Sequence, residues 1–177
     1  MRTSLNHLAS ALLLLFAGRI PTVAQDEIPS IEVFAGYAYL RTDASEGRVN
    51  LNGWNIALEK NLNRILGLTA DFDGAYGSQL GERISAHSVL FGPRLTARRT
   101  RVQLFTHALF GCVREAEARD VHYGFGMNLG GGLDYEVNRR ISFRLAQADY
   151  QYNRVNVLSH HNILFAAGLV LKFGEMN

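Results

Sequence analysis

Apolar and polar residues alternate along this chain, most regularly over Tyr123–Val137, which reads YGFGMNLGGGLDYEV. Every second residue from Tyr123 onward is apolar or, at Gly131, small. The intervening positions hold glycine, asparagine, aspartate and glutamate. Successive side chains of a β-strand point to opposite faces, so this stretch predicts a strand with one apolar face and one small, polar or charged face. About ten such residues, tilted, cross a bilayer as one strand of a barrel.

The same alternation recurs and predicts eight strands, at Ile31–Leu40, Leu51–Leu62, Ile65–Gly74, Arg83–Thr96, Arg101–Val113, Tyr123–Val137, Arg140–Tyr150 and His160–Gly174. The connections alternate between long and short. The long ones are polar loops at Arg41–Asn50, Ala75–Glu82, Arg114–Val121 and Gln151–Ser159. Barrels of bacterial outer membranes have short periplasmic turns and longer outer loops. We therefore expect an all-β fold, an eight-stranded antiparallel up-and-down transmembrane β-barrel with periplasmic termini.

Alternation alone does not say which face points outward, because a soluble calyx also alternates, with its apolar face inward. Three features favour lipid outside. The polar face is rich in glycine, which suits the crowded lumen of an eight-stranded barrel. It also carries charges of both signs, which can pair in a lumen. The apolar face holds no charged residue through the middle of most strands, as a lipid-facing surface requires, since a cation at the midplane costs roughly 2–4 kcal/mol.

The seventh strand departs from this pattern. Ile141, Phe143 and Leu145 share the apolar face, and continuing the alternation would point Gln147 and Asp149 outward. Either these two residues lie above the hydrocarbon near the outer rim, or a bulge after Leu145 resets the phase and places Asp149 in the lumen near Arg144. We favour the rim.

The N-terminus has the layout of a secretory signal peptide. Arg2 precedes the apolar run Leu8–Gly18, and Thr22-Val23-Ala24 supplies small residues for cleavage. We expect residues 1–24 to be removed and 25–177 to form the barrel domain. The formal charge of +2 is carried by Arg2 and Arg19 of the leader, so the mature chain is neutral. Such a balance argues against nucleic-acid binding, and the single cysteine excludes an intramolecular disulfide.

Two groups of residues are candidates for structural or binding roles. Charged residues on the glycine-rich face predict a lumen ion-pair network, with Glu59, Asp71, Arg94, Asp134 and Arg144 as its members. Such a network would fill the lumen. Aromatic residues on or near the apolar face predict interfacial girdles, formed by Tyr37, Tyr39, Trp54, Tyr123, Tyr135 and Phe173.

Catalytic chemistry has weaker support. His87-Ser88 and Ser159-His160-His161 resemble fragments of a hydrolase. Neighbouring residues of a strand face opposite sides, however, and a Ser–His pair needs hydrogen-bond reach. The same divergence argues against a metal site at His160 and His161, and the glycine run lacks the spacing of a dinucleotide fingerprint. We expect no enzyme activity, cofactor or metal.

The segments VFAGYAYL, LFGPRL and RISFRLAQADY, the export signal and Phe173 near the end of the last strand resemble the outer membrane protein beta-barrel domain family, the small OmpA/OmpX-like barrels. The resemblance implies a monomer in the outer membrane of a Gram-negative bacterium. It also implies contacts with outer-membrane lipids and, during insertion, with the barrel-assembly machinery. We expect a non-enzymatic structural or surface-interaction role. The alternatives are a lipid A-modifying barrel enzyme, a narrow pore and a soluble periplasmic ligand-binding barrel.

Overall fold

The computed structural model describes residues 28–44, 47–79, 82–117, 120–155 and 158–175. The expected signal peptide lies outside them. Apart from short connections, the described residues form β-strands: β1 Pro29–Ala44, β2 Gly47–Asn61, β3 Leu66–Gln79, β4 Glu82–Arg99, β5 Val102–Glu117, β6 Asp120–Asn138, β7 Ile141–Val155 and β8 Leu158–Glu175. Among these residues, none forms a helix long and apolar enough to cross a membrane.

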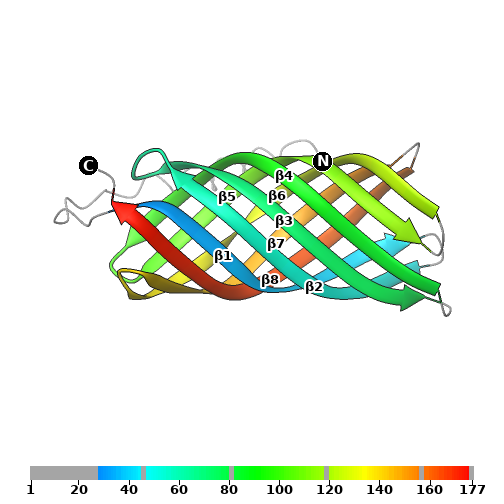
Figure 1. Ribbon diagram of the computed structural model, residues 1–177, viewed down its shortest axis with the longest axis horizontal. Coiled ribbons are helices and arrows are strands. Elements are labelled where there is room, and N and C mark those ends of the chain that lie inside the picture. The colour runs from blue at the N-terminus through cyan, green and yellow to red at the C-terminus, as the bar shows by residue number, and fades with distance from the viewer. Residues whose placement is uncertain (1–27, 45–46, 80–81, 118–119, 156–157, 176–177) are drawn as a thin grey trace, which may run out of the picture.

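The eight strands close into a barrel in sequence order, and every neighbouring pair is antiparallel (Figure 1). Closure comes from β1, which pairs with β2 on one side and with β8 on the other. Ile31 at the start of β1 lies opposite Phe173 near the end of β8. The first and last strands therefore meet edge to edge, and the sheet has no free edge. The predicted fold class is confirmed.

The apolar face of each strand points outward. Tyr123 is 70% exposed, and Phe125 and Leu169 are also exposed along their strands. The alternate positions point into the lumen, where even charged side chains such as Glu59 and Arg94 are almost fully buried. The alternation thus builds a wall with an apolar outside and a mixed polar inside.

The strands are longer than the alternation predicts. The four stretches expected to be loops are mostly strand: Arg41 pairs with Asn50, and Ala44 pairs with Gly47. Similarly, Gln79 pairs with Glu82 and Val155 with Leu158. The predicted loop boundaries were therefore wrong. Polar composition ended the predicted strands, but paired backbone in a hairpin needs no apolar face, so the ladders continue beyond the apolar band.

β7 contains the bulge that we considered and did not favour. The register against β8 shifts between Arg144 and Gln147, and Leu145 and Ala146 are both exposed. The extra residue returns the following positions to the opposite phase. Gln147 and Asp149 are therefore buried in the lumen rather than placed on the outer surface at the rim. The preference for the rim was wrong.

The two ends of the barrel are distinguished by which strands are connected there. We call the end with the connections between β2 and β3, β4 and β5, and β6 and β7 the turn end; it also holds the start of β1 and the end of β8. In Figure 1 it lies on the left, at the tip of the red strand β8. The opposite end is called the far end. The buried interior changes in chemistry from one to the other.

Near the far end, the side of the lumen formed by β1, β2, β3 and β8 is apolar. Inward-facing side chains of four adjacent strands pack together there, and we call this group the far-end cluster: Ala38, Leu40, Val49, Leu51, Ala75, Leu164 and Ala166. Ile84 and Ala86 of β4 pack against it. A small hydrophobic core thus fills one side of the lumen near the far end, while the buried polar side chains Gln151, Asn153 and Asn162 line the other side. Charged groups fill the lumen toward the turn end.

Candidate functional site: the filled lumen and the two rims

Four charged side chains meet across the lumen. Arg144 of β7 donates from Nε to Asp134 Oδ1 of β6 at 2.8 Å and from Nη2 to Glu59 Oε1 of β2 at 2.9 Å. Arg94 of β4 forms a salt bridge with the same Glu59 and lies 3.3 Å from Asp134. We call these four residues the arginine network. Two cations and two anions balance one another, and all four side chains are at least 96% buried.

Two phenylalanine rings, Phe34 and Phe105, stack against the guanidinium groups of the arginine network. The guanidinium carbon of Arg94 lies 3.9 Å from the ring centre of Phe105, and that of Arg144 lies 4.3 Å from the same ring. The guanidinium carbon of Arg144 also lies 4.2 Å from the ring centre of Phe34. Such stacking is favourable because a ring face attracts a cation, most strongly away from water.

Glycines make room for these rings. A Cβ on Gly36 would lie 2.6 Å from Cζ of Phe34, and one on Gly132 would lie 2.7 Å from Cζ of Phe105. Real Cβ atoms do not approach so closely. Two members of the glycine-rich face therefore have a specific task, which is to let an aromatic ring lie flat on the wall beneath a guanidinium.

Two further ion pairs lie closer to the turn end. Glu32 Oε1 accepts from Arg98 Nη2 at 3.1 Å, and Asn61 Nδ2 also donates to it at 2.9 Å. Lys172 Nζ donates to Glu136 Oε2 at 2.6 Å, which Gln103 Nε2 shares at 3.2 Å. The turn half of the lumen is thus crossed by three separate sets of paired charges.

A chain of hydrogen bonds leads from the arginine network toward the middle of the barrel. Arg144 Nη1 donates to Gln147 Oε1 at 2.8 Å, and Gln147 Nε2 donates to Asp149 Oδ2 at 2.6 Å. Asp149 Oδ1 in turn lies 3.0 Å from Nε2 of His107. His107 has the inward-facing parity of β5, but sequence reasoning missed Asp149 as its partner, because only the bulge brings Asp149 inside.

Asp71 lies in a different setting from the other four candidates for the ion-pair network. Its Oδ1 accepts from Asn55 Nδ2 at 2.9 Å, and among the described residues no cation pairs with it. Asp73, two residues along, accepts from Ser88 and, at 3.4 Å, from Gln151. The difference arises because β3 lines the wall at a level where the neighbouring strands supply amides and a hydroxyl rather than guanidinium groups. No cluster in the described part of the chain has the composition of a metal site.

Ser88 and His87 lie on opposite faces of β4, as their adjacency predicts. Ser88 is buried against Asp73, whereas His87 points outward, with Nε2 3.0 Å from the hydroxyl of Tyr76. Ser159 and His161 both lie on the outer surface of β8. Ser159 Oγ is 3.0 Å from the hydroxyl of Tyr152, and His161 Nδ1 bonds the hydroxyl of Tyr150. These tyrosine–histidine contacts form an outer rim at the far end.

The six aromatic residues expected at interfaces all belong to the outward-facing positions. Tyr39 is half-buried and the other five are exposed. Tyr135 and Phe173 lie toward the turn end, Tyr123 lies toward the far end opposite Arg114, and Tyr37 and Trp54 are register partners. Tyr76, Tyr150 and Tyr152 were not predicted to belong to these girdles, because Tyr76 and Tyr152 fall in stretches expected to be loops.

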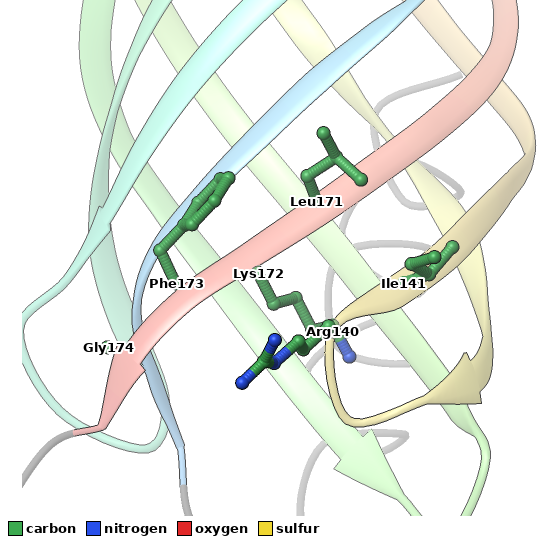
Figure 2. A pocket seen from close by; sticks show the side chains of 6 residues that line it. All are labelled: Arg140, Ile141, Leu171, Lys172, Phe173 and Gly174. Carbon is green, nitrogen blue, oxygen red and sulfur yellow. The ribbon is translucent and has the colours of Figure 1, made fainter.

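A shallow pocket of about 410 Å³ lies at the turn end, where β7 begins and β8 ends (Figure 2). Its lining combines apolar side chains with two cations: Arg140, Ile141, Leu171, Lys172, Phe173 and Gly174. Leu171 and Phe173 are exposed on the outer surface of the barrel. Lys172 instead reaches inward to Glu136.

The fold is similar to that of several solved β-barrels. Neisserial surface protein A matches with a TM-score of 0.69 at 17% identity, over 81% of this chain and 97% of that chain. Ail, the attachment invasion locus protein of Yersinia pestis, matches with a TM-score of 0.58 at 16% identity, over 81% of this chain and 99% of that chain. The N-terminal β-barrel domain of Pseudomonas aeruginosa OprF gives a TM-score of 0.50 at 12% identity, over 82% and 98%. The sequence matches no protein-family model and no curated protein.

Proposed function

We propose that this protein is a small integral outer-membrane β-barrel of the OmpA/OmpX-like kind, with a filled lumen and a non-enzymatic structural or surface-interaction role. The observation that carries the proposal is the inversion of the usual soluble pattern. Large apolar side chains cover the outside, and charged pairs fill the inside. Exposing such a surface to water would destabilise a soluble barrel, whereas the hydrocarbon of a bilayer is a favourable environment for it.

The inversion also separates this proposal from its alternatives. A ligand-binding calyx needs an apolar cavity, but here the interior holds charged side chains toward the turn end and a packed cluster toward the far end. A pore needs an open lumen, and the arginine network crosses this one. A lipid A-modifying enzyme needs a serine, a histidine and a carboxylate together at one rim. Ser88 meets a carboxylate inside the wall, while His87 lies outside it.

Export by the N-terminal leader, insertion by the barrel-assembly machinery, periplasmic termini and a monomeric state belong to the same proposal. In that orientation the far end faces the medium. Two of the fold neighbours are named a surface protein and an attachment invasion locus protein. We extend a role in surface contacts to the far-end hairpins of this chain, whose outer tyrosine–histidine rim would lie at the level of the lipid headgroups.

Fractionation of expressing cells tests this proposal. We expect the protein to sediment with the outer membrane, and its unboiled gel band to migrate differently from the boiled one. A matched pair of variants sharpens the test: Leu169→Arg on the outer face should reduce the amount inserted, because a cation there meets hydrocarbon, whereas Arg83→Gln at the far end should not. Recovery of folded protein in the periplasm would overturn the proposal.

A further inference from the structure

Exposed cations gather at the turn end. Six of them lie in or beside its three short connections: Lys60, Arg64, Arg99, Arg101, Arg139 and Arg140. Two of the acids described at this end already have cation partners, since Glu32 pairs with Arg98 and Glu136 with Lys172. Among the described residues, Glu175 is the exposed acid that remains there. Among the described residues, exposed cations therefore outnumber exposed acids at the turn end, and we call these cations the positive ring.

An apolar collar lies directly beside this ring. Apolar side chains in the connection between β2 and β3, and on the outer face of the strands beside the turns, are exposed: Leu62, Ile65, Leu95, Leu104, Val137 and Phe173. In a bilayer such side chains meet acyl chains, and the long arginine side chains next to them reach the headgroup level. The ring is thus placed where lipid phosphates lie.

Arg140 is the member of the positive ring that lines the pocket. Its backbone N–H donates to Asn138 Oδ1 at 2.8 Å, and its carbonyl oxygen accepts from the N–H of Lys172 at 2.8 Å. The backbone is therefore fixed on both sides, while the exposed guanidinium makes no hydrogen bond or ion pair with any described residue. Arg140 lines the pocket together with Leu171 and Phe173, and Figure 2 shows it next to Lys172, with Leu171 and Phe173 along β8.

From this arrangement we infer that the turn end binds anionic glycerophospholipid in the adjoining leaflet, with the pocket at Arg140 as its principal site. The guanidinium of Arg140 binds the lipid phosphate, to which it can donate two parallel hydrogen bonds. One acyl chain lies against Ile141, Leu171 and Phe173. The other cations of the ring favour a lipid with net negative charge over a zwitterionic one. This inference rests on the proposed membrane location and adds to it a lipid class and a site.

Lipid retention by the folded protein tests the inference. The full chain, extracted from membranes in a mild detergent, is mixed with equal amounts of phosphatidylglycerol and phosphatidylcholine, and native mass spectrometry counts each lipid retained. Near an anionic surface each arginine contributes on the order of 1 kcal/mol, or about fivefold in binding. We expect phosphatidylglycerol to be retained at least that much better. Arg140→Gln should lower its retention by about fivefold, and Arg140→Lys by less, because the charge is kept.

Arg83→Gln, which removes an exposed arginine from the far end, is the matched control and should leave retention unchanged. Equal retention of the two lipids by the unaltered protein would overturn the inference. So would equal losses in Arg140→Gln and Arg83→Gln. Insertion into vesicles of pure phosphatidylcholine or of pure phosphatidylglycerol, followed by the gel shift on boiling, tells the two proposals apart. A barrel that inserts there without preferring the anionic lipid refutes this inference alone, while a chain that inserts in neither lipid refutes both.

Discussion

Two groups of buried side chains fill different parts of the lumen with different chemistry. Toward the turn end, charged side chains from β2, β4, β6 and β7 meet in the arginine network. Toward the far end, β1, β2, β3 and β8 contribute the aliphatic far-end cluster. Phe34 belongs to both regions, since it packs with the cluster and also lies under the guanidinium of Arg144. The barrel wall therefore encloses two groups of buried side chains, and ion pairing stabilises one of them while apolar packing stabilises the other.

The contrast bears on how each half tolerates change. A buried charge is costly unless its partners remain, so the arginine network should fail abruptly when one member is lost. An aliphatic cluster loses dispersion contacts and buried area in proportion to what is removed, so it should fail gradually. The comparison predicts that single substitutions near the turn end cost more than substitutions of similar size near the far end.

The largest effect is expected for Arg144→Met, which keeps much of the side-chain volume but removes the cation. Glu59 and Asp134 would each lose a charged partner, and breaking a buried pair typically costs about 3–5 kcal/mol. The free energy of unfolding, measured by urea titration of the barrel in phosphatidylcholine vesicles, should fall by that amount. Arg140→Met is the control at an exposed arginine and should change it little. A loss below about 1 kcal/mol at Arg144 would show that the network contributes specificity rather than stability.

The wall of the barrel could be predicted from the sequence because alternation is a local property. Glu59, Arg94, Asp134 and Arg144 could be placed on the inner face by counting along each strand. Which of them meet could not be predicted in the same way. Glu59 and Arg144 are 85 residues apart, and their contact depends on the stagger of strands around the closed barrel.

The bulge in β7 shows a second limit. Leu145 and Ala146 are both outward-facing, and no glycine or proline marks the change of phase. The signal that was present was chemical: Gln147 and Asp149 would otherwise have faced outward beside Phe143 and Leu145. Strand length was also underestimated, because polar hairpin ends continue the backbone ladder without an apolar face.

The next largest effect is expected for Leu51→Ala in the far-end cluster. Leu51 is fully buried against Leu40, its register partner on β1, and leaving a cavity there should cost about 3 kcal/mol. The same urea titration measures it. If the two halves are independent, the costs of Leu51→Ala and Arg144→Met should add within about 0.5 kcal/mol in the double variant. A larger departure from additivity would mean that Phe34 couples the two regions.

A pair of glycine substitutions compares the halves at matched chemistry. Gly132→Ala places a methyl group against the ring of Phe105 and the carbonyl oxygen of Ala146, neither of which can move without disturbing the wall. We expect a loss of about 2 kcal/mol. Gly126→Ala meets the ends of the Val113 and Leu90 side chains, which can change rotamer, so its cost should be smaller. Equal costs, measured by the same titration, would contradict the idea that glycine is needed under the aromatic ring.

The smallest effect is expected for the stacking of cations on Phe105. Phe105→Leu keeps an apolar side chain in the lumen but removes the ring face that lies 3.9 Å from the guanidinium carbon of Arg94. A double-mutant cycle with Arg94→Met separates the stacking from the loss of packing, and we expect a coupling energy of about 1 kcal/mol. The control cycle combines Val113→Ala with Arg94→Met. Its coupling energy should be near zero, because Val113 lies on the same strand as Phe105 but farther toward the far end. If both cycles gave the same value, the ring would act only as apolar filling, and the turn half would owe its closure to ion pairs without aromatic support.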